Sequence, residues 1–441
     1  MNMRLYYRKR GRNPMPRSGE RQAAILWHPP AMRLRRLLPL SICLLPSLGF
    51  AETGSGPWQF DFGTNPPAAG HTQVTAATRF TAAQPYGFEL AGKPDDLVDA
   101  ITSSGGCHFS LEVPEGDYEI TLTLGAKDRA TDTTVKAECR RLMLEGIQVP
   151  AGKTRTEKFT VNVRRPLISG SDSVRLKDRE KPYLHWDNKL TLEFNGPQPG
   201  IDSMQIRAVT VPVIYVIGDS TVTDQPNEPW NSWGQMLTRF LDAGVSVANY
   251  AESGESIKSS LSAKRIAKVE RNLKKGDYVL VQFGHNDMKD KAPDALETYR
   301  KNLLTIAADV RKAGATPVLV TSMERKGGVE KDTLGGYPDA VRSVAKELKV
   351  PLIDLHAMSR VLYQALGPKL DLAFQDGTHH NNYGSYELAR CVVEGLRKEC
   401  PELASHIRPD AKPFNPAKPD KPEDFKVPAS PNKDAAKPDG N

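Results

Sequence analysis

The sequence lacks the features of several common protein classes. Its five cysteines show no spacing that resembles a structural zinc site, and no apolar run is long enough to span a bilayer comfortably. Lys and Arg outnumber Asp and Glu by 60 to 53, but ten of the basic residues and one acid, Glu20, lie within residues 1–51. The rest of the chain carries 50 basic and 52 acidic side chains, so its charge gives no support for nucleic-acid binding.

Residues 1–51 are predicted to be a leader with a signal peptide. The basic segment Met32–Arg36 precedes the apolar stretch Leu37–Phe50, and cleavage after Ala51 would follow the small-x-small rule. Residues 1–31 are polar, basic and patternless, so we hypothesise that translation starts at Met32. Precursor peptides from before Met32, found by mass spectrometry, would refute this. Cys43 offers a lipoprotein alternative, although Ile42 stands where a small residue is expected. The protein is expected to be exported, periplasmic or secreted, with no stable membrane anchor.

Export would permit disulfides among the four cysteines that follow the leader. Pairing within each predicted domain, Cys107 with Cys139 and Cys391 with Cys400, is favoured among the three possible connectivities. Buried free thiols are the alternative interpretation.

Residues 52–210 are predicted to form a β-sandwich. Runs of alternating apolar and polar residues recur at 107–113, 118–124, 157–163 and 189–194, separated by turn residues. Four aromatic side chains of this region could form a platform for sugars, but packing in the core or between domains is the favoured interpretation. They are Trp58, Tyr183, His185 and Trp186.

From residue 211 the pattern changes to alternating strands and helices, which favours a parallel sheet with right-handed crossovers up to residue 400. Strands are predicted at 213–217, 245–250, 278–283, 317–321 and 351–355. Helices are predicted at 233–241, 261–273, 294–313, 338–348 and 383–398. Residues 401–441 contain nine prolines and are predicted to be a disordered tail, because they cannot bury enough apolar surface.

Three short stretches carry the chemistry. Ser220 follows the first buried strand of this region, which places its hydroxyl at the carboxyl edge of the sheet, where open α/β folds bind ligands. Asn286 offers a side-chain amide that can donate to an oxyanion. Asp376 and His379 supply a carboxylate and an imidazole three residues apart, one to orient and one to act as base. Together these residues indicate a serine hydrolase.

These stretches resemble, in order, the blocks of SGNH (GDSL-type) hydrolases. Within that superfamily, residues 213–400 are most similar to rhamnogalacturonan acetylesterases of carbohydrate esterase family 12. The matching blocks are Gly218-Asp219-Ser220-Thr221, Phe283-Gly284-His285-Asn286-Asp287 and Asp376-Gly377-Thr378-His379. The resemblance implies an α/β flavodoxin-like three-layer sandwich with a five-stranded parallel sheet. The preceding sandwich resembles galactose-binding-like modules through Phe60–Gly63 and Tyr86–Glu89.

The resemblance also implies the role of each site residue. Ser220 would be the nucleophile, His379 the base and Asp376 its orienting partner. The oxyanion hole would consist of the backbone N–H groups of Ser220 and Gly254 and the side-chain amide of Asn286. No metal or organic cofactor is expected.

Other polar residues of these blocks are given supporting roles. Asp219 and Asp287 are interpreted as loop-shaping, His285 as packing near the site, and His380 as a supporting or surface residue. Trp230 and Trp233 are assigned to packing at the start of a helix, with substrate contact by one of them left open. Many lipolytic members have Leu where this chain has Thr221, which is evidence against lipids.

The sequence therefore predicts an exported carbohydrate O-acetylesterase that acts on an acetylated polysaccharide, such as rhamnogalacturonan, or its oligosaccharides. One alternative is a lipase, lysophospholipase or thioesterase on the same fold. Another is a non-catalytic glycan-binding protein, which the intact set of site residues argues against.

Overall fold

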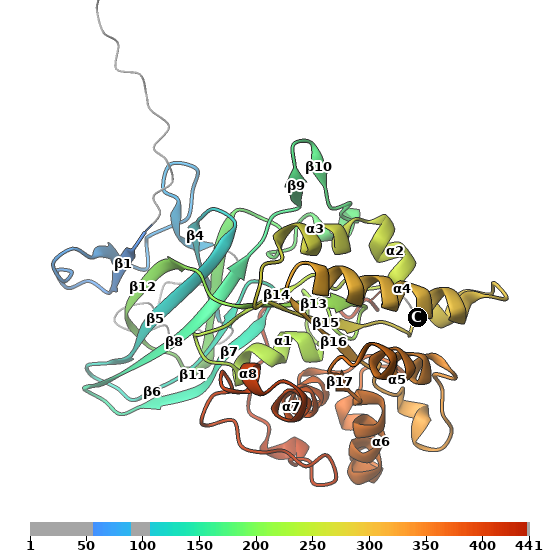
Figure 1. Cartoon of the computed structure of the whole chain (residues 1–441). Helices are drawn as coiled ribbons and strands as arrows, with labels where there is room; N and C mark the ends of the chain where they lie inside the picture. The colour runs from blue at the N-terminus through green and yellow to red at the C-terminus, as the bar shows by residue number, and fades with distance from the viewer. Residues whose placement is uncertain (1–55, 90–105, 439–441) are drawn as a thin grey trace, which may run out of the picture. The chain divides into compact units, whose positions relative to one another are not determined.

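The computed structural model describes residues 56–89 and 106–438, so the predicted leader lies outside the described residues. All described residues belong to one compact unit, Glu52–Asn441, which contains both a β-sandwich and a parallel sheet (Figure 1). Within these two ranges, no helix is both long enough and apolar enough to cross a membrane.

The predicted sandwich is present as two five-stranded sheets. Strand β5 (Gly116–Ala126) illustrates its alternation: Tyr118, Ile120, Leu122 and Leu124 are buried, and the residues between them are partly exposed. The likeness to galactose-binding modules stays a prediction. The first sheet has the order β2 (Thr72–Val74), β1 (Trp58–Phe62), β12 (Ile201–Val209), β5 (Gly116–Ala126), β8 (Lys153–Val163). The second has the order β3 (Tyr86–Glu89), β4 (Cys107–Glu112), β11 (Lys189–Gln198), β6 (Thr131–Ala137), β7 (Arg141–Val149).

Most of the aromatic side chains considered as a sugar platform are packing residues. Trp186 is buried against Tyr250, with ring centroids 5.6 Å apart, and His185 is 1% exposed. Trp58 packs beside Tyr118 of the sandwich core. Tyr183 is half-buried and differs from these three because it lines cavities.

The parallel sheet has the flavodoxin-like order that the SGNH resemblance implies. Its strand order is β14 (Ser246–Asn249), β13 (Val213–Gly218), β15 (Tyr278–Gln282), β16 (Thr316–Val320), β17 (Leu352–Ile353). All four neighbouring pairs are parallel. The chain therefore reverses its direction of travel across the sheet between β13 and β15, which is where such folds bind ligands.

Helices cover both faces of this sheet and complete three layers. The helices are α1 (Trp233–Leu237), α2 (Ile257–Ser262), α3 (Arg265–Asn272), α4 (Ala295–Lys312), α5 (Tyr337–Leu348), α6 (Leu355–Leu366), α7 (Asn382–Glu399) and α8 (Pro401–Ala404). Successive residues of β13 point to opposite faces: Ile214 and Val216 pack with α1, α6 and α7, while Tyr215 and Ile217 pack with α3, α4 and α5. Figure 1 shows α1 and α7 on one side and α3 and α4 on the other.

Two helical predictions differ from the structure. The helix expected at 261–273 is divided into α2 and α3, because Lys264 adopts a left-handed conformation with φ of 62°. Helix α6 was not predicted: its first residue, Leu355, was assigned to the preceding strand, and the rest of it was assigned to no element. Asp354 marks its start, as its side chain accepts a hydrogen bond from the Ala357 N–H.

The prediction of a disordered tail from residue 401 is wrong for residues 401–438, which pack against the rest of the unit. Val427 and Phe414 are each 8% exposed, and Phe414 lies under the Arg390 guanidinium at 4.1 Å. The Glu228 N–H donates to the Asn432 carbonyl, and the Asp434 N–H donates to the Glu228 carbonyl. The composition of the tail did not indicate this packing, because its few apolar residues pack against side chains from other parts of the chain.

The favoured disulfide pairing is also wrong. Cys107, Cys139, Cys391 and Cys400 are all free and buried, as the alternative interpretation held. Cys107 and Cys139 belong to the sandwich region, and the other two lie at α7 and its end. The thiols therefore act as small apolar side chains.

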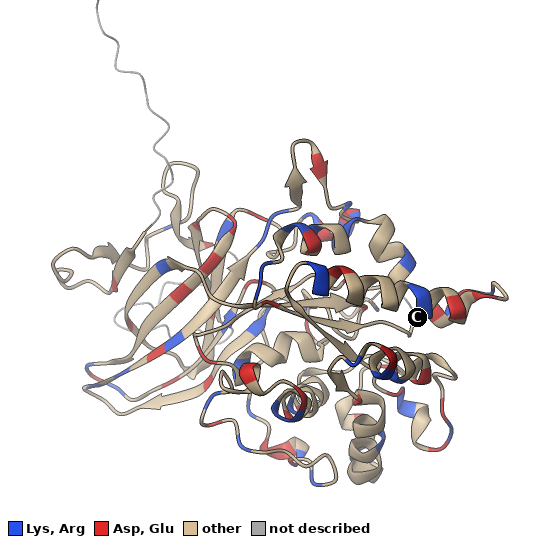
Figure 2. Ribbon diagram, in the orientation of Figure 1, with Lys and Arg blue, Asp and Glu red and all other residues tan. Residues whose placement is uncertain are grey.

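Basic and acidic residues are interspersed on the described elements (Figure 2). Some of these charges join the sandwich to the loop after β13. Arg141 donates to the Val247 carbonyl at 2.9 Å and lies 3.3 Å from Asp224, which Arg164 also faces at 3.7 Å. All three charged side chains are fully buried, so the sandwich fixes the loop that follows Ser220.

Candidate active site

Ser220 lies two residues beyond the end of β13, at the carboxyl edge of the sheet. It is 2% exposed, and its carbonyl accepts a hydrogen bond of 2.7 Å from the Gln225 side chain. Asp219 shapes this turn by accepting from the Thr221 N–H and hydroxyl at 3.0 and 2.7 Å. The loop therefore fixes the serine at the reversal point of the sheet.

His379 and Asp376 lie in the loop before α7 and complete a chain of hydrogen bonds to Ser220. The His379 Nε2 is 2.8 Å from the Ser220 Oγ, and its Nδ1 is 2.9 Å from the Asp376 Oδ2. The Asp376 Oδ1 accepts from the backbone N–H groups of Thr378 and His379 at 2.7 and 2.6 Å. This geometry lets the imidazole take a proton from the serine while the carboxylate faces its other nitrogen.

The charge of Asp376 is stabilised by these contacts. Burial would raise its pKa, but hydrogen bonds from the His379 side chain and backbone outweigh burial and hold that pKa below its usual range. The carboxylate is therefore ionised at neutral pH.

The three predicted oxyanion donors come from loops at the same sheet edge. Gly254 follows β14 and has a φ of 80°, which glycine adopts without strain. Within the described part of the chain, neither the Ser220 nor the Gly254 backbone N–H donates a hydrogen bond. The Asn286 amide donates to the Glu255 carbonyl at 3.0 Å, which orients it and leaves its second N–H for another acceptor.

The remaining polar residues of the blocks brace these loops. The His285 Nδ1 lies 3.3 Å from Asp219, and its Nε2 lies 3.0 Å from the Met323 carbonyl. The Asp287 carboxylate accepts from the Ile257 N–H at 2.9 Å. His380 is buried against Tyr363, whose hydroxyl lies 2.8 Å from its Nε2; burial and the neighbouring His379 and His285 lower the pKa of His380 to about 3. His380 is thus a packing residue.

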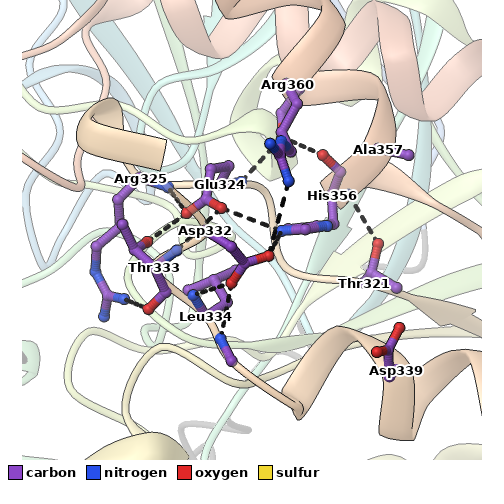
Figure 3. A network of polar contacts seen from close by, with 12 residues as sticks. Thr321, Glu324, Arg325, Asp332, Thr333, Leu334, Asp339, His356, Ala357 and Arg360 are labelled. Carbon is purple, nitrogen blue, oxygen red and sulfur yellow. Dashed lines mark hydrogen bonds and ion pairs between the residues drawn. The ribbon is translucent and has the colours of Figure 1, made fainter. Parts of the chain in front are cut away.

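Arg325 was not identified from the sequence, yet it joins two of the site loops. Its guanidinium donates to the His285 carbonyl at 3.2 Å and to the Thr378 hydroxyl at 3.3 Å. Its own loop is held by Glu324, whose carboxylate accepts from the Arg325 N–H and from the Thr333 side chain and N–H (Figure 3). The signal in the sequence is only a basic residue shortly after a strand, which is too common to select.

Two clusters among the described residues have metal-ligand chemistry. Glu324, Asp332 and His356 lie within reach of one ion (Figure 3). However, Arg342 donates to the His356 Nδ1 at 3.2 Å, so the Nε2 carries the proton and faces both carboxylates, at 3.2 and 3.3 Å. This cluster is satisfied without an ion.

The second cluster, Glu180, His185 and Glu252, is compensated by arginines. Arg265 binds Glu180 at 2.5 Å, and Arg179 binds Glu252 at 2.6 Å. The two carboxylates therefore offer no excess negative charge to a cation.

Trp230 also lies closer to the candidate catalytic residues than its predicted packing role indicates. Its ring meets the His379 imidazole edge-to-face, with centroids 5.7 Å apart. It therefore packs directly against the proposed base, in addition to starting the segment before α1. Only the fold brings it to His379, which follows 149 residues later in the chain.

A parallel sheet with Ser220 at its reversal point, linked to an imidazole and a carboxylate, has the arrangement of groups that serine hydrolases use. The chain matches the model of the GDSL-like lipase/acylhydrolase family over residues 216–385. It is 38% identical over 216 residues to the rhamnogalacturonan acetylesterase RhgT of Bacillus subtilis (strain 168), covering 44% of this chain and 93% of that protein. The chain therefore belongs to the GDSL-like lipase/acylhydrolase family and is an esterase.

A further relative aligns with a larger share of this chain. The uncharacterized esterase YxiM of Bacillus subtilis (strain 168) is 26% identical over 373 residues, covering 78% of this chain and 91% of that protein. A crystal structure of the protein YxiM from Bacillus subtilis matches with a TM-score of 0.43 and 22% identity, covering 79% of this chain and 100% of that one.

Proposed function

We propose that this esterase is an exported carbohydrate O-acetylesterase that removes acetyl groups from a polysaccharide such as rhamnogalacturonan. The continuous hydrogen-bond chain from Ser220 through His379 to Asp376 supports the reaction. The relative named rhamnogalacturonan acetylesterase, which this chain matches over 93% of its length, supports the substrate.

The first half-reaction forms an acyl-enzyme. The Ser220 Oγ attacks the acetyl carbonyl carbon as its proton passes to the His379 Nε2. The carbonyl oxygen becomes an oxyanion held by the N–H groups of Ser220 and Gly254 and by Asn286. The intermediate then collapses, the bond to the sugar oxygen breaks, and that oxygen leaves with the proton from His379.

The second half-reaction releases acetate. Water gives a proton to His379 and attacks the acetyl-serine carbonyl through the same oxyanion hole. Collapse of this intermediate breaks the bond to the Ser220 Oγ, which recovers its proton from His379. Asp376 keeps the imidazole in the required tautomer throughout and is not itself protonated.

The test is acetate release from acetylated rhamnogalacturonan and acetylated xylan by the wild type and by Ser220→Ala. Acetate from the wild type alone supports the proposal, and the better polymer identifies the substrate class. No acetate from either polymer, with hydrolysis of 4-nitrophenyl acetate retained, would reject the carbohydrate substrate. A preference for 4-nitrophenyl octanoate over acetate would favour the lipase or thioesterase alternative.

Export is part of the proposal and rests on the leader at residues 1–51. In a cell with a secretory pathway, the mature protein is expected outside the cytoplasm with Glu52 as its first residue. Amino-terminal sequencing of the processed protein measures this, and a mature chain that retains Met32 would contradict it.

A further inference from the structure

Two cavities lie side by side between the esterase region and the segments outside its family match. One has a volume of about 210 Å³ and the other about 620 Å³. They share a common wall made of Tyr183, Pro226 and Asn227. The two cavities are therefore adjacent, and we name them together the Tyr183 groove, because Tyr183 lines both.

The smaller cavity is lined by residues that contact each member of the hydrogen-bond chain. Among the residues that line it, Gln225 donates to the Ser220 carbonyl at 2.7 Å. Trp230 packs against the His379 ring at 5.7 Å, and the Lys437 Nζ lies 3.7 Å from the Asp376 carboxylate. A molecule in this cavity would therefore be separated from Ser220, His379 and Asp376 by one layer of side chains.

The larger cavity continues the groove onto the sandwich. His108, Glu138 and Arg140 of the sandwich line one wall, and Asn432 of the carboxyl-terminal tail lines another. Arg179, Tyr183 and the tail residues 434–438 all lie outside the residues matched by the family model. The groove is thus formed jointly by a loop of the hydrolase, which supplies Pro226 and Asn227, and by segments outside the family match.

The lining of the groove suits a carbohydrate chain. Aromatic rings such as Tyr183 can pack against the apolar faces of sugar rings, while amides and charged side chains, such as Asn227, Lys181 and Lys189, can bind hydroxyl groups. Tyr183 is half-buried, so part of its ring is available to a ligand. A channel for a long acyl chain would instead need a continuous apolar wall.

We propose that the Tyr183 groove binds sugar residues of the acetylated polysaccharide next to the one that is deacetylated. In this proposal, which rests on the proposed function, the sandwich and the tail are part of the substrate site. Tyr183 is then a residue that determines specificity for a polymer over a small ester.

The test compares two variants with a matched control. Tyr183→Ala removes the ring, and Asn227→Trp fills the groove from a half-buried loop position without removing a hydrogen bond described in the structure. Lys433→Ala changes an exposed residue of the same tail that does not line the groove, and it should behave as wild type. The substrates are acetylated rhamnogalacturonan oligosaccharides and 4-nitrophenyl acetate, with melting temperatures measured for each protein.

Each groove variant is expected to raise KM for the oligosaccharides about 5- to 10-fold, with kcat changed less than about twofold. Its effect on kcat/KM for 4-nitrophenyl acetate should be clearly smaller. In a Ser220→Ala background, calorimetric titration with the same oligosaccharides should show the same loss of affinity.

Wild-type turnover of the oligosaccharides tests the proposed function, and the variants test the groove. If the wild type turns them over and both variants keep the wild-type KM, the groove proposal is overturned alone. An equal loss on both substrates also overturns it. If the wild type releases no acetate from the oligosaccharides, both proposals fail.

Discussion

Replacement of Asp376 by Asn should be far more damaging than the small chemical change indicates. The Asp376 Oδ1 accepts from two backbone N–H groups, at 2.7 and 2.6 Å, and Oδ2 lies 2.9 Å from the His379 Nδ1. The two N–H donors require an oxygen at the first position, so the amide nitrogen of the Asn must face the imidazole. That nitrogen donates to Nδ1, which forces the proton onto Nε2.

An imidazole protonated at Nε2 cannot accept the Ser220 proton. The expected loss in kcat is about 10⁴-fold, which corresponds to about 5 kcal/mol in the barrier, by analogy with the wrong-tautomer effect in serine proteases. The serine should stay within hydrogen-bond distance of His379, since the backbone contacts that hold the loop are retained.

The assay is kcat for 4-nitrophenyl acetate, with Asp371→Asn as the matched control. Asp371 is 82% exposed and lies in the segment that leads to the same loop, so its variant should keep wild-type activity. Melting temperatures of both variants exclude unfolding as the cause. An Asp376→Asn enzyme within tenfold of wild type would refute the tautomer argument.

Three further predictions follow from buried groups. Burial raises the pKa of Asp287 to about 7, so between about pH 4 and pH 7 the folded state binds an extra proton and the wild type loses about 4 kcal/mol of stability at most as pH rises. Asp287→Asn should remove the part of this loss that falls between pH 5 and pH 8, about 3 kcal/mol in urea unfolding at those two pH values, and an unchanged pH slope would contradict it. Glu228→Ala should lower the free energy of unfolding measured in urea by about 3–5 kcal/mol, because it leaves Arg140 buried without its carboxylate partner. It should also expose residues 428–438 to proteases, since the Ser430 N–H loses its acceptor, and tail cleavage as slow as in wild type would count against this. The four described thiols should react with Ellman's reagent only after unfolding, because burial raises the pKa of each, to about 12 for Cys400; rapid reaction of any one of them in the native mature protein would contradict this.

The parallel sheet could be predicted because its signals are local. Each strand is a short apolar run. Ser220 lies in the segment that follows β13, and Asn286 lies in the segment that follows β15. Asp376 and His379 are three residues apart, so their pairing required no knowledge of the fold. The sequence could therefore place these side chains at one edge of the sheet.

The parts that escaped prediction depend on contacts between distant segments. Arg325 donates hydrogen bonds to His285 and Thr378 in two separate loops, and the residues next to Arg325 in the sequence indicate neither contact. The tail has the composition of a disordered chain, yet Lys136 of the sandwich binds the Pro428 carbonyl and the Ser430 hydroxyl at 2.8 and 2.6 Å. Composition measures what a segment can bury alone, and here the partner lies almost 300 residues away.

Glu228 shows that the region matched by the family model depends on contacts with the sandwich and the tail. Its carboxylate is bound by Arg140 of the sandwich at 2.6 Å, by Asn382 at the start of α7 and by the backbone of Ser430 in the tail. Trp230, two residues further on, packs against His379. The 170 residues that match the family model are therefore not a self-contained unit that could be excised or exchanged intact. A graft of this esterase onto another sandwich would have to supply a new counter-charge for Glu228 before the loop beside His379 could be restored.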